Sequence, residues 1–124
     1  MNERHHAIIA LASNHEAEKN LFEARRCLEQ ILFDIHYSEC KRSQAFGSKS
    51  QGDYYNQLLF GTTDLSVEQL IEALKQIEIN MGRTQTAREQ GIVCIDLDLM
   101  LYDEQRYHLR DWERPYIQCL LSQT

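Results

Sequence analysis

Two acidic residues lie two positions apart in an apolar stretch of the C-terminal third of the chain. Asp96 and Asp98 interrupt residues 92–102, a segment rich in β-branched and large apolar side chains that contains neither proline nor glycine. This composition predicts a β-strand, in which successive side chains point to opposite faces. The two carboxylates therefore share one face, about 7 Å apart. They repel each other there unless water or a cation lies between them.

The pattern alone leaves two interpretations of this acidic pair open. The first is an uncovered sheet face that simply exposes two acids to water. The second is a divalent-metal site for a phosphate ligand. Mg²⁺ prefers oxygen ligands and is often held by one or two carboxylates together with substrate phosphates, which fits an acidic pair of this kind.

The composition of the 124 residues excludes several classes of protein. The length predicts one domain over residues 1–124, and 43% hydrophobic with 26% charged residues is typical of a soluble globular protein. A net charge of -6 with scattered lysines and arginines argues against nucleic-acid binding. Because no long apolar run and no signal peptide occur, we expect a cytoplasmic protein that binds no membrane.

The cysteines and histidines give no metal-binding pattern. Cys27, Cys40, Cys94 and Cys119 are far apart in the sequence and form no C-x-x-C pair. They are therefore predicted to be reduced, mostly buried thiols. The five histidines show no spacing typical of metal ligands.

Four segments predict the strands of one sheet. Residues 5–12 form a short apolar strand expected to be buried on both faces, and residues 34–42 and 53–62 alternate as strands do. Residues 92–102 are the fourth strand. The ten residues 43–52 are rich in small side chains and form a loop, interpreted as either a mobile spacer or a ligand lid.

Two stretches with apolar residues every three or four positions predict amphipathic helices. The first begins at Ala17 and ends near Phe33, and the second covers residues 67–81 with Gly82 as its C-terminal stop. Each is preceded by a capping-box signature, Ser-x-x-Glu at residues 13–16 and Ser-x-x-Gln at 66–69.

The order of these elements is βαββαβ, which predicts an α+β, ferredoxin-like fold. In this arrangement two helices pack on one face of a four-stranded antiparallel sheet, with the core over residues 5–102. Residues 83–90 are expected to form a loop, and residues 103–124 a short, partly ordered tail with one helical turn. We expect the helices to cover the apolar side of the last strand, leaving Asp96 and Asp98 on the open side. That apolar side comprises Ile95, Leu97, Leu99 and Leu101.

Four stretches match a known family in order and with near-family spacing, over residues 7–102. They are Ala10-Leu11-Ala12-Ser13-Asn14, Asp53-Tyr54-Tyr55-Asn56, Leu70-Ile71-Glu72-Ala73-Leu74 with Ile77-Glu78 and Gly82-Arg83, and Ile95-Asp96-Leu97-Asp98-Leu99-Met100-Leu101-Tyr102. On these residues the chain resembles the 6-hydroxymethyl-7,8-dihydropterin pyrophosphokinases of folate biosynthesis. The resemblance implies transfer of pyrophosphate from ATP to the hydroxymethyl group of a pterin, with release of AMP.

The resemblance also implies a role for each matching residue. Asp96 and Asp98 would bind two Mg²⁺ ions that bridge the phosphates of the co-substrate ATP, and Asp96 would approach the pterin hydroxyl. Arg83 would be a catalytic cation, and Arg88 would partly replace a family arginine that is missing here. The implied pterin-binding residues are Ser43, Ala45, Phe46, Tyr54 and Asn56. The implied nucleotide-binding residues are Ile71, Lys75, Glu78, Leu99 and Tyr116.

The chain departs from the family just before the acidic strand, where residues 90–93 read Gln-Gly-Ile-Val in place of a Trp-Gly-Pro-Arg run. The missing ring removes stacking of the kind worth about 1–3 kcal/mol, and the missing arginine removes a charge-assisted phosphate contact. Two hypotheses stay open: a pyrophosphokinase whose activity is impaired, and a non-catalytic module that binds a ligand or a protein partner. A homodimer that covers a sheet edge is a further expectation.

Overall fold

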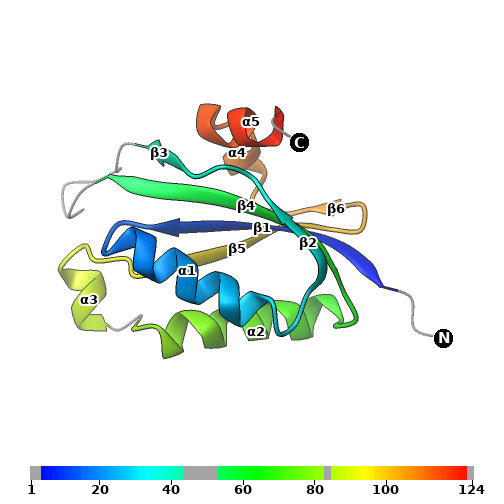
Figure 1. Ribbon diagram of the computed structural model, residues 1–124, viewed down its shortest axis with the longest axis horizontal. Coiled ribbons are helices and arrows are strands. Elements are labelled where there is room, and N and C mark those ends of the chain that lie inside the picture. The colour runs from blue at the N-terminus through cyan, green and yellow to red at the C-terminus, as the bar shows by residue number, and fades with distance from the viewer. Residues whose placement is uncertain (1–3, 44–52, 83–84, 123–124) are drawn as a thin grey trace.

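The computed structural model describes residues 4–43, 53–82 and 85–122, and it consists of one antiparallel sheet with helices on both faces (Figure 1). The mixed α and β architecture expected from the sequence is confirmed. The strands are β1 (His5–Ser13), β2 (Phe33–Tyr37), β3 (Lys41–Ser43), β4 (Tyr54–Thr63), β5 (Asp96–Tyr102) and β6 (Gln105–Arg106). The helices are α1 (Ala17–Leu28), α2 (Val67–Asn80), α3 (Gln85–Glu89), α4 (Leu109–Trp112) and α5 (Pro115–Ser122).

The sheet is built around β1, which pairs with β4 on one side and with β5 on the other. The strand order is β2-β4-β1-β5-β6, β3 pairs with the beginning of β4, and all pairs are antiparallel. The sheet therefore has six strands among the described residues, and the expected number of four is wrong. The predicted strand over 34–42 is divided into β2 and β3, and a short hairpin adds β6 beyond β5.

Two buried polar side chains explain the division of the predicted second strand. The hydroxyl of Ser38 accepts a hydrogen bond from the amide of Leu58 at 2.9 Å. The side-chain nitrogen of Gln57 donates to the carbonyl oxygen of Ser38, also at 2.9 Å. These contacts replace ladder hydrogen bonds, so the chain stays attached to β4 where the regular pairing is interrupted.

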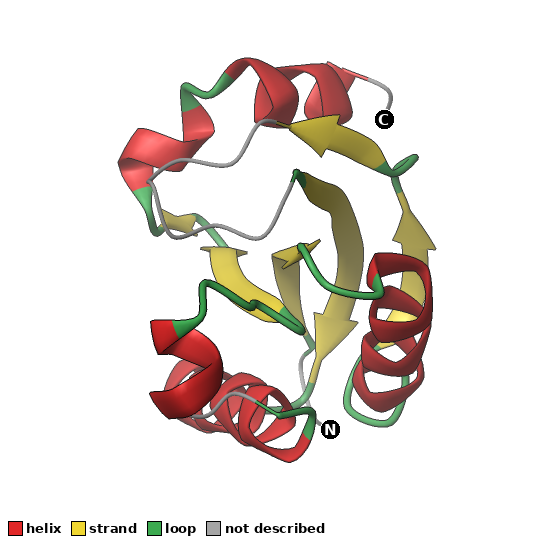
Figure 2. Cartoon of the chain, turned by 90° about the vertical axis from the view of Figure 1, so that its left-hand side faces the viewer, coloured by secondary structure: helices red, strands yellow, loops and turns green. Residues whose placement is uncertain are grey.

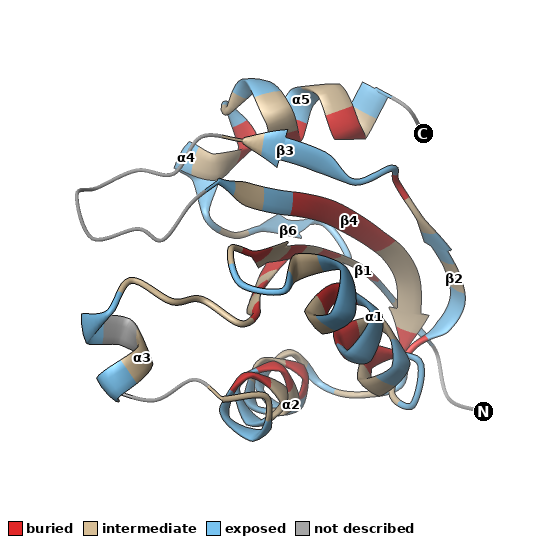
Figure 3. Cartoon of the chain, turned by 60° about the vertical axis from the view of Figure 1, so that its left-hand side comes forward, coloured by how far each residue is buried: buried red, intermediate tan, exposed pale blue. Residues whose placement is uncertain are grey.

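The main hydrophobic core lies between the sheet and the helices α1 and α2, where buried residues line the inner faces of both layers (Figure 3). Leu97 and Leu99 lie on this side of β5 as predicted, but Leu101 does not. The register of β1 and β5 shifts, so that Ile9 pairs with Leu99 while Ile8 pairs with Leu101. This β-bulge sends Leu101 to the opposite face, where it packs against a second cluster.

The second face of the sheet is covered over part of its area by α4 and α5 (Figure 2). The indole nitrogen of Trp112 donates to the carbonyl oxygen of Tyr107 at 2.9 Å. Two expectations are therefore wrong: that residues 103–124 form a partly ordered tail with one helical turn, and that helices lie on one face of the sheet only. Both helices are short, so packing stabilises them more than local sequence does. The second cluster consists of Leu58, Met100, Trp112, Ile117 and Leu120.

β1 was expected to be buried on both faces, and its two faces differ. Ala7, Ile9 and Leu11 are buried against α1 and α2, whereas Ile8 and Ala10 are only half buried on the side of α5. The expectation holds for the first face and is only partly met on the second. The incomplete cover of the second face leaves room near the acidic pair of β5.

The two predicted capping boxes have different outcomes. At α2 the box is confirmed, because Ser66 Oγ accepts from the Gln69 amide at 3.2 Å and Gln69 Oε1 accepts from the Ser66 amide at 2.9 Å. At α1 the prediction is wrong. Ser13 ends β1, and its hydroxyl donates to backbone carbonyls including that of Val93, at 3.3 Å. The N-cap of α1 is Glu16 in a left-handed conformation with φ 41°.

Three helix boundaries also test the sequence predictions. α1 ends at Leu28 rather than near Phe33, because the chain must turn into β2. α2 is followed by Gly82 with φ 108°, as expected for a glycine that stops a helix. The short helix α3 occupies most of residues 83–90, where a loop was expected.

Side-chain exposure and helix length bear on two expectations from composition. All four cysteines are free, as predicted, but none is buried: Cys40 is exposed and the others are half buried. The expectation of mostly buried thiols is therefore wrong. In the described part of the chain, no helix has the length and apolar character needed to cross a membrane.

Candidate functional site

The acidic pair of β5 lies on the second face of the sheet, beside two alanines of β1. Asp96 pairs with Ala12 and Asp98 pairs with Ala10, so the cross-strand neighbours of both acids carry only a methyl group. Both aspartates are half buried. Each of them lines two separate pockets, and the pair therefore stands where the two pockets meet.

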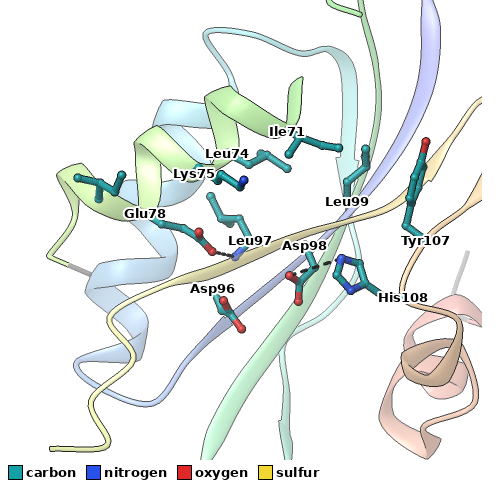
Figure 4. A pocket seen from close by; sticks show the side chains of 11 residues that line it. Ile71, Leu74, Lys75, Glu78, Asp96, Leu97, Asp98, Leu99, Tyr107 and His108 are labelled. Carbon is teal, nitrogen blue, oxygen red and sulfur yellow. Dashed lines mark hydrogen bonds and ion pairs between the residues drawn. The ribbon is translucent and has the colours of Figure 1, made fainter. Parts of the chain in front are cut away.

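The first pocket, here named the α2 pocket, has a volume of about 640 Å³ and lies between α2 and β5 (Figure 4). Its apolar lining comes mainly from the two elements, and Lys75 and His108 add polar groups. Four of the five residues implied for nucleotide binding line it. These four residues are Ile71, Lys75, Glu78 and Leu99.

The second pocket, here named the β4 pocket, has a volume of about 210 Å³ and lies between β4 and the helix α5. Ser43, Tyr54 and Asn56, three of the residues implied for pterin binding, line it together with the acidic pair. Tyr116, implied for the nucleotide, lines this pocket and not the α2 pocket. The structure thus brings most of the candidate residues to two adjoining pockets.

Several candidate residues fall outside the described part of the chain. Ala45, Phe46 and Arg83 are among them, and so is the loop over residues 44–52 that was interpreted as a spacer or lid. Arg88 belongs to α3, but its side chain is not described. Their roles stay predictions.

Asn56 is buried in β4, where its side chain forms hydrogen bonds with β3 and also lines the β4 pocket. Its side-chain nitrogen donates to the carbonyl oxygen of Lys41 at 2.9 Å and to Ser43 Oγ at 2.8 Å. Because a carbonyl oxygen can only accept, the nitrogen of the amide must face Lys41. Both donor hydrogens of Asn56 are engaged within the protein, so towards a ligand this side chain offers its oxygen as an acceptor.

Tyr107 and His108 line the α2 pocket, although the sequence did not indicate them as site residues. The Nε2 atom of His108 lies 3.8 Å from Asp98 Oδ1, and Figure 4 shows the imidazole beside the carboxylate. His108 adopts a left-handed conformation, φ 53°, at the start of α4. No sequence pattern indicated this position, because it depends on how the C-terminal segment packs against β5.

The C-terminal segment also brings Arg114 into the β4 pocket. Its Nε atom donates to Asp111 Oδ1 at 2.8 Å, and both residues line the pocket with the acidic pair. Burial raises the pKa of the Tyr116 hydroxyl, and the negative charges of Asp111, Asp98 and Asp96 raise it further, while Arg114 opposes them. The pocket is therefore a site where acidic charge dominates and one arginine offsets part of it.

The segment that leads into β5 is held by Asn14, the residue that follows β1. Asn14 Oδ1 accepts from the amide of Val93 at 2.6 Å, and its side-chain nitrogen donates to the carbonyl oxygen of Gly91 at 2.9 Å. The backbone amide of Asn14 also donates to the Val93 carbonyl oxygen at 3.0 Å. Val93, one of the positions that depart from the family, is thus held by both the backbone and the side chain of Asn14.

The acidic pair fits a hard divalent cation that takes its other ligands from a substrate. Asp96 and Asp98 supply carboxylate oxygens, the donor type that Mg²⁺ prefers. No group of three or more histidine, cysteine or acidic side chains suited to a metal occurs in residues 4–43, 53–82 and 85–122. A complete cage for zinc is therefore absent from that part of the chain, whereas two carboxylates suffice for Mg²⁺ bound with phosphates and water.

Comparison with known proteins is decisive for the family. The model of the 7,8-dihydro-6-hydroxymethylpterin-pyrophosphokinase (HPPK) family matches residues 8–123 of this chain. The chain belongs to this family. The match includes the C-terminal segment with His108 and Arg114, beyond the residues on which the resemblance was based.

Individual relatives agree with the HPPK assignment. The chain is 33% identical over 103 residues to the 2-amino-4-hydroxy-6-hydroxymethyldihydropteridine pyrophosphokinase of Haemophilus influenzae, covering 80% of this chain and 63% of that protein. It is 29% identical over 120 residues to a folate synthesis bifunctional protein of Arabidopsis thaliana, covering 89% of this chain and 25% of that one. The chain thus spans about a quarter of the bifunctional relative and less than two thirds of the bacterial enzyme.

A solved structure supports the fold. The crystal structure of Plasmodium falciparum HPPK-DHPS with pteroate aligns with a TM-score of 0.58 at 14% identity. The alignment covers 82% of this chain and 28% of that one. The identity is low, so this likeness concerns the fold alone.

Proposed function

We propose that this HPPK-family chain transfers a diphosphate group from Mg-ATP to 6-hydroxymethyl-7,8-dihydropterin. In this proposal the α2 pocket holds the nucleotide and the β4 pocket holds the pterin. The observation that carries the proposal is that Asp96 and Asp98 line both pockets. A transfer between two substrates needs them to meet at one set of catalytic groups, and this geometry provides that meeting point.

The lining of the α2 pocket suits a nucleotide. Ile71, Leu74 and Leu99 give an apolar surface for a base, while Lys75 and His108 bring nitrogen donors to the side on which phosphates would lie. The β4 pocket is smaller, as a pterin requires. There Tyr54 and Tyr116 offer aromatic rings, and Asn56 offers an acceptor oxygen to the N–H groups of the ring edge.

The proposed reaction forms a bond between the pterin hydroxyl oxygen and the β-phosphorus and breaks the bond from that phosphorus to the α-phosphate oxygen. AMP leaves, and the hydroxyl proton passes to solvent by way of Asp96, which approaches the hydroxyl. Mg²⁺ held by Asp96 and Asp98 would neutralise charge on the phosphate oxygens. The side chains of both pockets would otherwise act by positioning the two substrates.

We propose that the activity is weaker than that of a family member which has the tryptophan and the arginine of the Trp-Gly-Pro-Arg run. Gln90, Ile92 and Val93 stand where the family's tryptophan, proline and arginine would be, and the backbone of Val93 is engaged by Asn14. Val93 cannot supply a positive charge. Arg114, at the wall of the β4 pocket, is the cation that we propose compensates in part.

The same departures favour a second candidate function, a non-catalytic module that binds a nucleotide or a pterin without transfer. An assay of AMP release separates the two. The enzyme proposal predicts AMP formation that requires ATP, Mg²⁺ and the pterin together, in equal amount to the diphosphorylated pterin. Ligand binding without pterin-dependent AMP would favour the module, and absence of both binding and AMP formation would contradict both candidates.

A further inference from the structure

Glu78 is a buried carboxylate in a helix stripe that is otherwise apolar. The buried residues of α2 are Leu70, Leu74 and Glu78, which are spaced by four and therefore share one face. Glu78 is only 6% exposed. An acidic side chain is rarely buried to this extent unless hydrogen bonds satisfy it, since burial of a charge is costly. Packing alone does not explain a glutamate where a leucine would fill the same space.

The carboxylate of Glu78 binds the backbone of β5. Its Oε2 atom accepts a hydrogen bond from the amide of Leu97 at 2.8 Å, and Figure 4 shows this contact running from α2 to the strand. Leu97 lies between the two acids of the candidate site. Its own side chain points away from them, into the main core.

The Leu97 amide would otherwise lack a strand partner. β6 pairs with β5 only at Leu101 and Tyr102, so within residues 4–43, 53–82 and 85–122 β5 is an edge strand at residues 96–99. On such an edge an amide either reaches water or is satisfied by a side chain. Glu78 therefore takes the place that a neighbouring strand would occupy. It fixes the strand at the one residue that separates Asp96 from Asp98.

We infer that Glu78 is a positioning residue, which sets the orientation of Asp96 and Asp98 by holding the Leu97 amide. It acts through the backbone of β5 and not by contact with a substrate or a cation. This differs from the nucleotide contact that the family resemblance implies for Glu78. The inference rests on the proposed function, because that function gives Asp96 and Asp98 their role as metal ligands. The hydrogen bond from the Leu97 amide to Glu78 can be tested without any ligand.

The experiment compares the full chain with Glu78→Gln, Glu78→Ala and the control Glu72→Ala. Glu72 lies on an exposed part of the same helix, outside both pockets. Glutamine keeps an oxygen that can accept from the Leu97 amide but loses the charge, whereas alanine loses both. The first readout is the affinity for a complex of Mn²⁺ with a non-hydrolysable ATP analogue, measured by electron paramagnetic resonance of the Mn²⁺ ion. The second is NMR of the ligand-free chain: hydrogen exchange at Leu97 and the carboxyl carbon shifts of Asp96 and Asp98.

The inference predicts that Glu78→Ala weakens the Mn²⁺-nucleotide complex by about tenfold or more, as loss of a group that orients metal ligands usually does. The affinities of Glu78→Gln and Glu72→Ala for this complex should stay within about threefold of the affinity of the parent chain, a smaller change than that expected for Glu78→Ala. Only Glu78→Ala should accelerate exchange at Leu97 and move both carboxyl resonances. If Glu78→Gln binds the Mn²⁺-nucleotide complex as weakly as Glu78→Ala does, the charge of Glu78 matters and the inference is wrong.

Two further outcomes separate this inference from the proposed function. Unchanged carboxyl resonances and exchange in Glu78→Ala would overturn the inference, whatever the chain binds. A parent chain that binds no Mn²⁺-nucleotide complex would contradict the proposed function. In that case the NMR comparison of the ligand-free variants still decides whether Glu78 orients the two aspartates.

Discussion

Ala12 of β1 lies directly opposite Asp96 of β5 in the antiparallel ladder, so a single methyl group stands beside this carboxylate on its face of the sheet. Both residues line the β4 pocket. A larger side chain on β1 would fill the space that separates β5 from β4 on this face. The small residues at this point of β1 are thus part of the site and not only of the sheet.

We therefore expect Ala12→Leu to close the β4 pocket while leaving the α2 pocket open, because Ala12 lines only the former. Pterin binding should fall by more than about tenfold, which corresponds to 1.4 kcal/mol. Nucleotide binding should change little. Calorimetric titration with each ligand measures both. An equal loss of both affinities would show that the substitution distorts β1 instead.

Replacement of Asp98 by asparagine tests the metal interpretation. The side chain of Asp98 is 35% exposed, so we expect its charge to contribute little to folding. Asp98→Asn should abolish Mg²⁺-dependent nucleotide binding and leave the melting temperature of the ligand-free chain almost unchanged. Thermal denaturation with and without Mg-nucleotide checks this. A large drop in the ligand-free melting temperature would instead make Asp98 a structural residue.

Asn14 should contribute to stability because its side chain bonds both Gly91 and Val93. Each such hydrogen bond is worth about 0.5–1.5 kcal/mol, so Asn14→Ala should lower the free energy of unfolding by about 1–3 kcal/mol. Urea denaturation measures the change. Asn20 is half buried in α1, and its side-chain nitrogen donates to the His15 carbonyl oxygen. It supplies the control Asn20→Ala, for which a smaller loss is expected because one such hydrogen bond is removed and not two.

Trp112 tests whether the C-terminal helices belong to the folded core. Its side chain is 9% exposed and packs in the second cluster with Met100 and Leu120. Trp112→Ala should destabilise the chain by about 3–5 kcal/mol, as is usual for buried aromatic residues. The control Leu109→Ala removes a side chain that is 66% exposed and should cost little. Equal losses in urea denaturation would contradict the packing of α4 and α5 described here.

The pair of His5 and Asp103 predicts a pH dependence. The hydrogen bond from His5, at 2.7 Å, lowers the pKa of Asp103. The hydrogen bond from the His6 amide and the positive charges of His5 and His6 lower this pKa further. A group with a lowered folded pKa stabilises the protein above its unfolded pKa, near 3.9 for aspartate. The stabilisation is lost as pH falls through the lowered value. Melting temperatures of the parent and Asp103→Asn should therefore differ above about pH 4 and converge at lower pH. A constant difference at all pH values would contradict this.

The parts of the fold that depend on local pattern were predictable. The acids of β5 share a face because strand side chains alternate, and the box at Ser66 depends on residues three positions apart. The bulge that moves Leu101 to the other face has no local signal. The same holds for Ser13, whose hydroxyl binds the distant Val93 and so cannot cap α1. Such contacts are decided by the tertiary structure.

The candidate site was predictable to the same extent. Tyr54, Asn56 and the two aspartates could be placed because motifs in the sequence carry them. His108 and Arg114 could not, because they reach the pockets only when α4 and α5 pack on the second cluster. The buried role of Glu78 also follows from the open edge of β5, which the sequence pattern does not reveal.

Calorimetric titration of 6-hydroxymethylpterin into the chain, with and without Mg²⁺ and a non-hydrolysable ATP analogue, tests whether the two pockets share the acidic pair. Because Asp96 and Asp98 line both pockets, we predict nucleotide binding that requires Mg²⁺. We also predict pterin binding that is at least about tenfold tighter once Mg-nucleotide is bound, a difference of 1.4 kcal/mol. Absence of binding of either ligand, or a pterin affinity that is the same with and without Mg-nucleotide, would contradict these predictions.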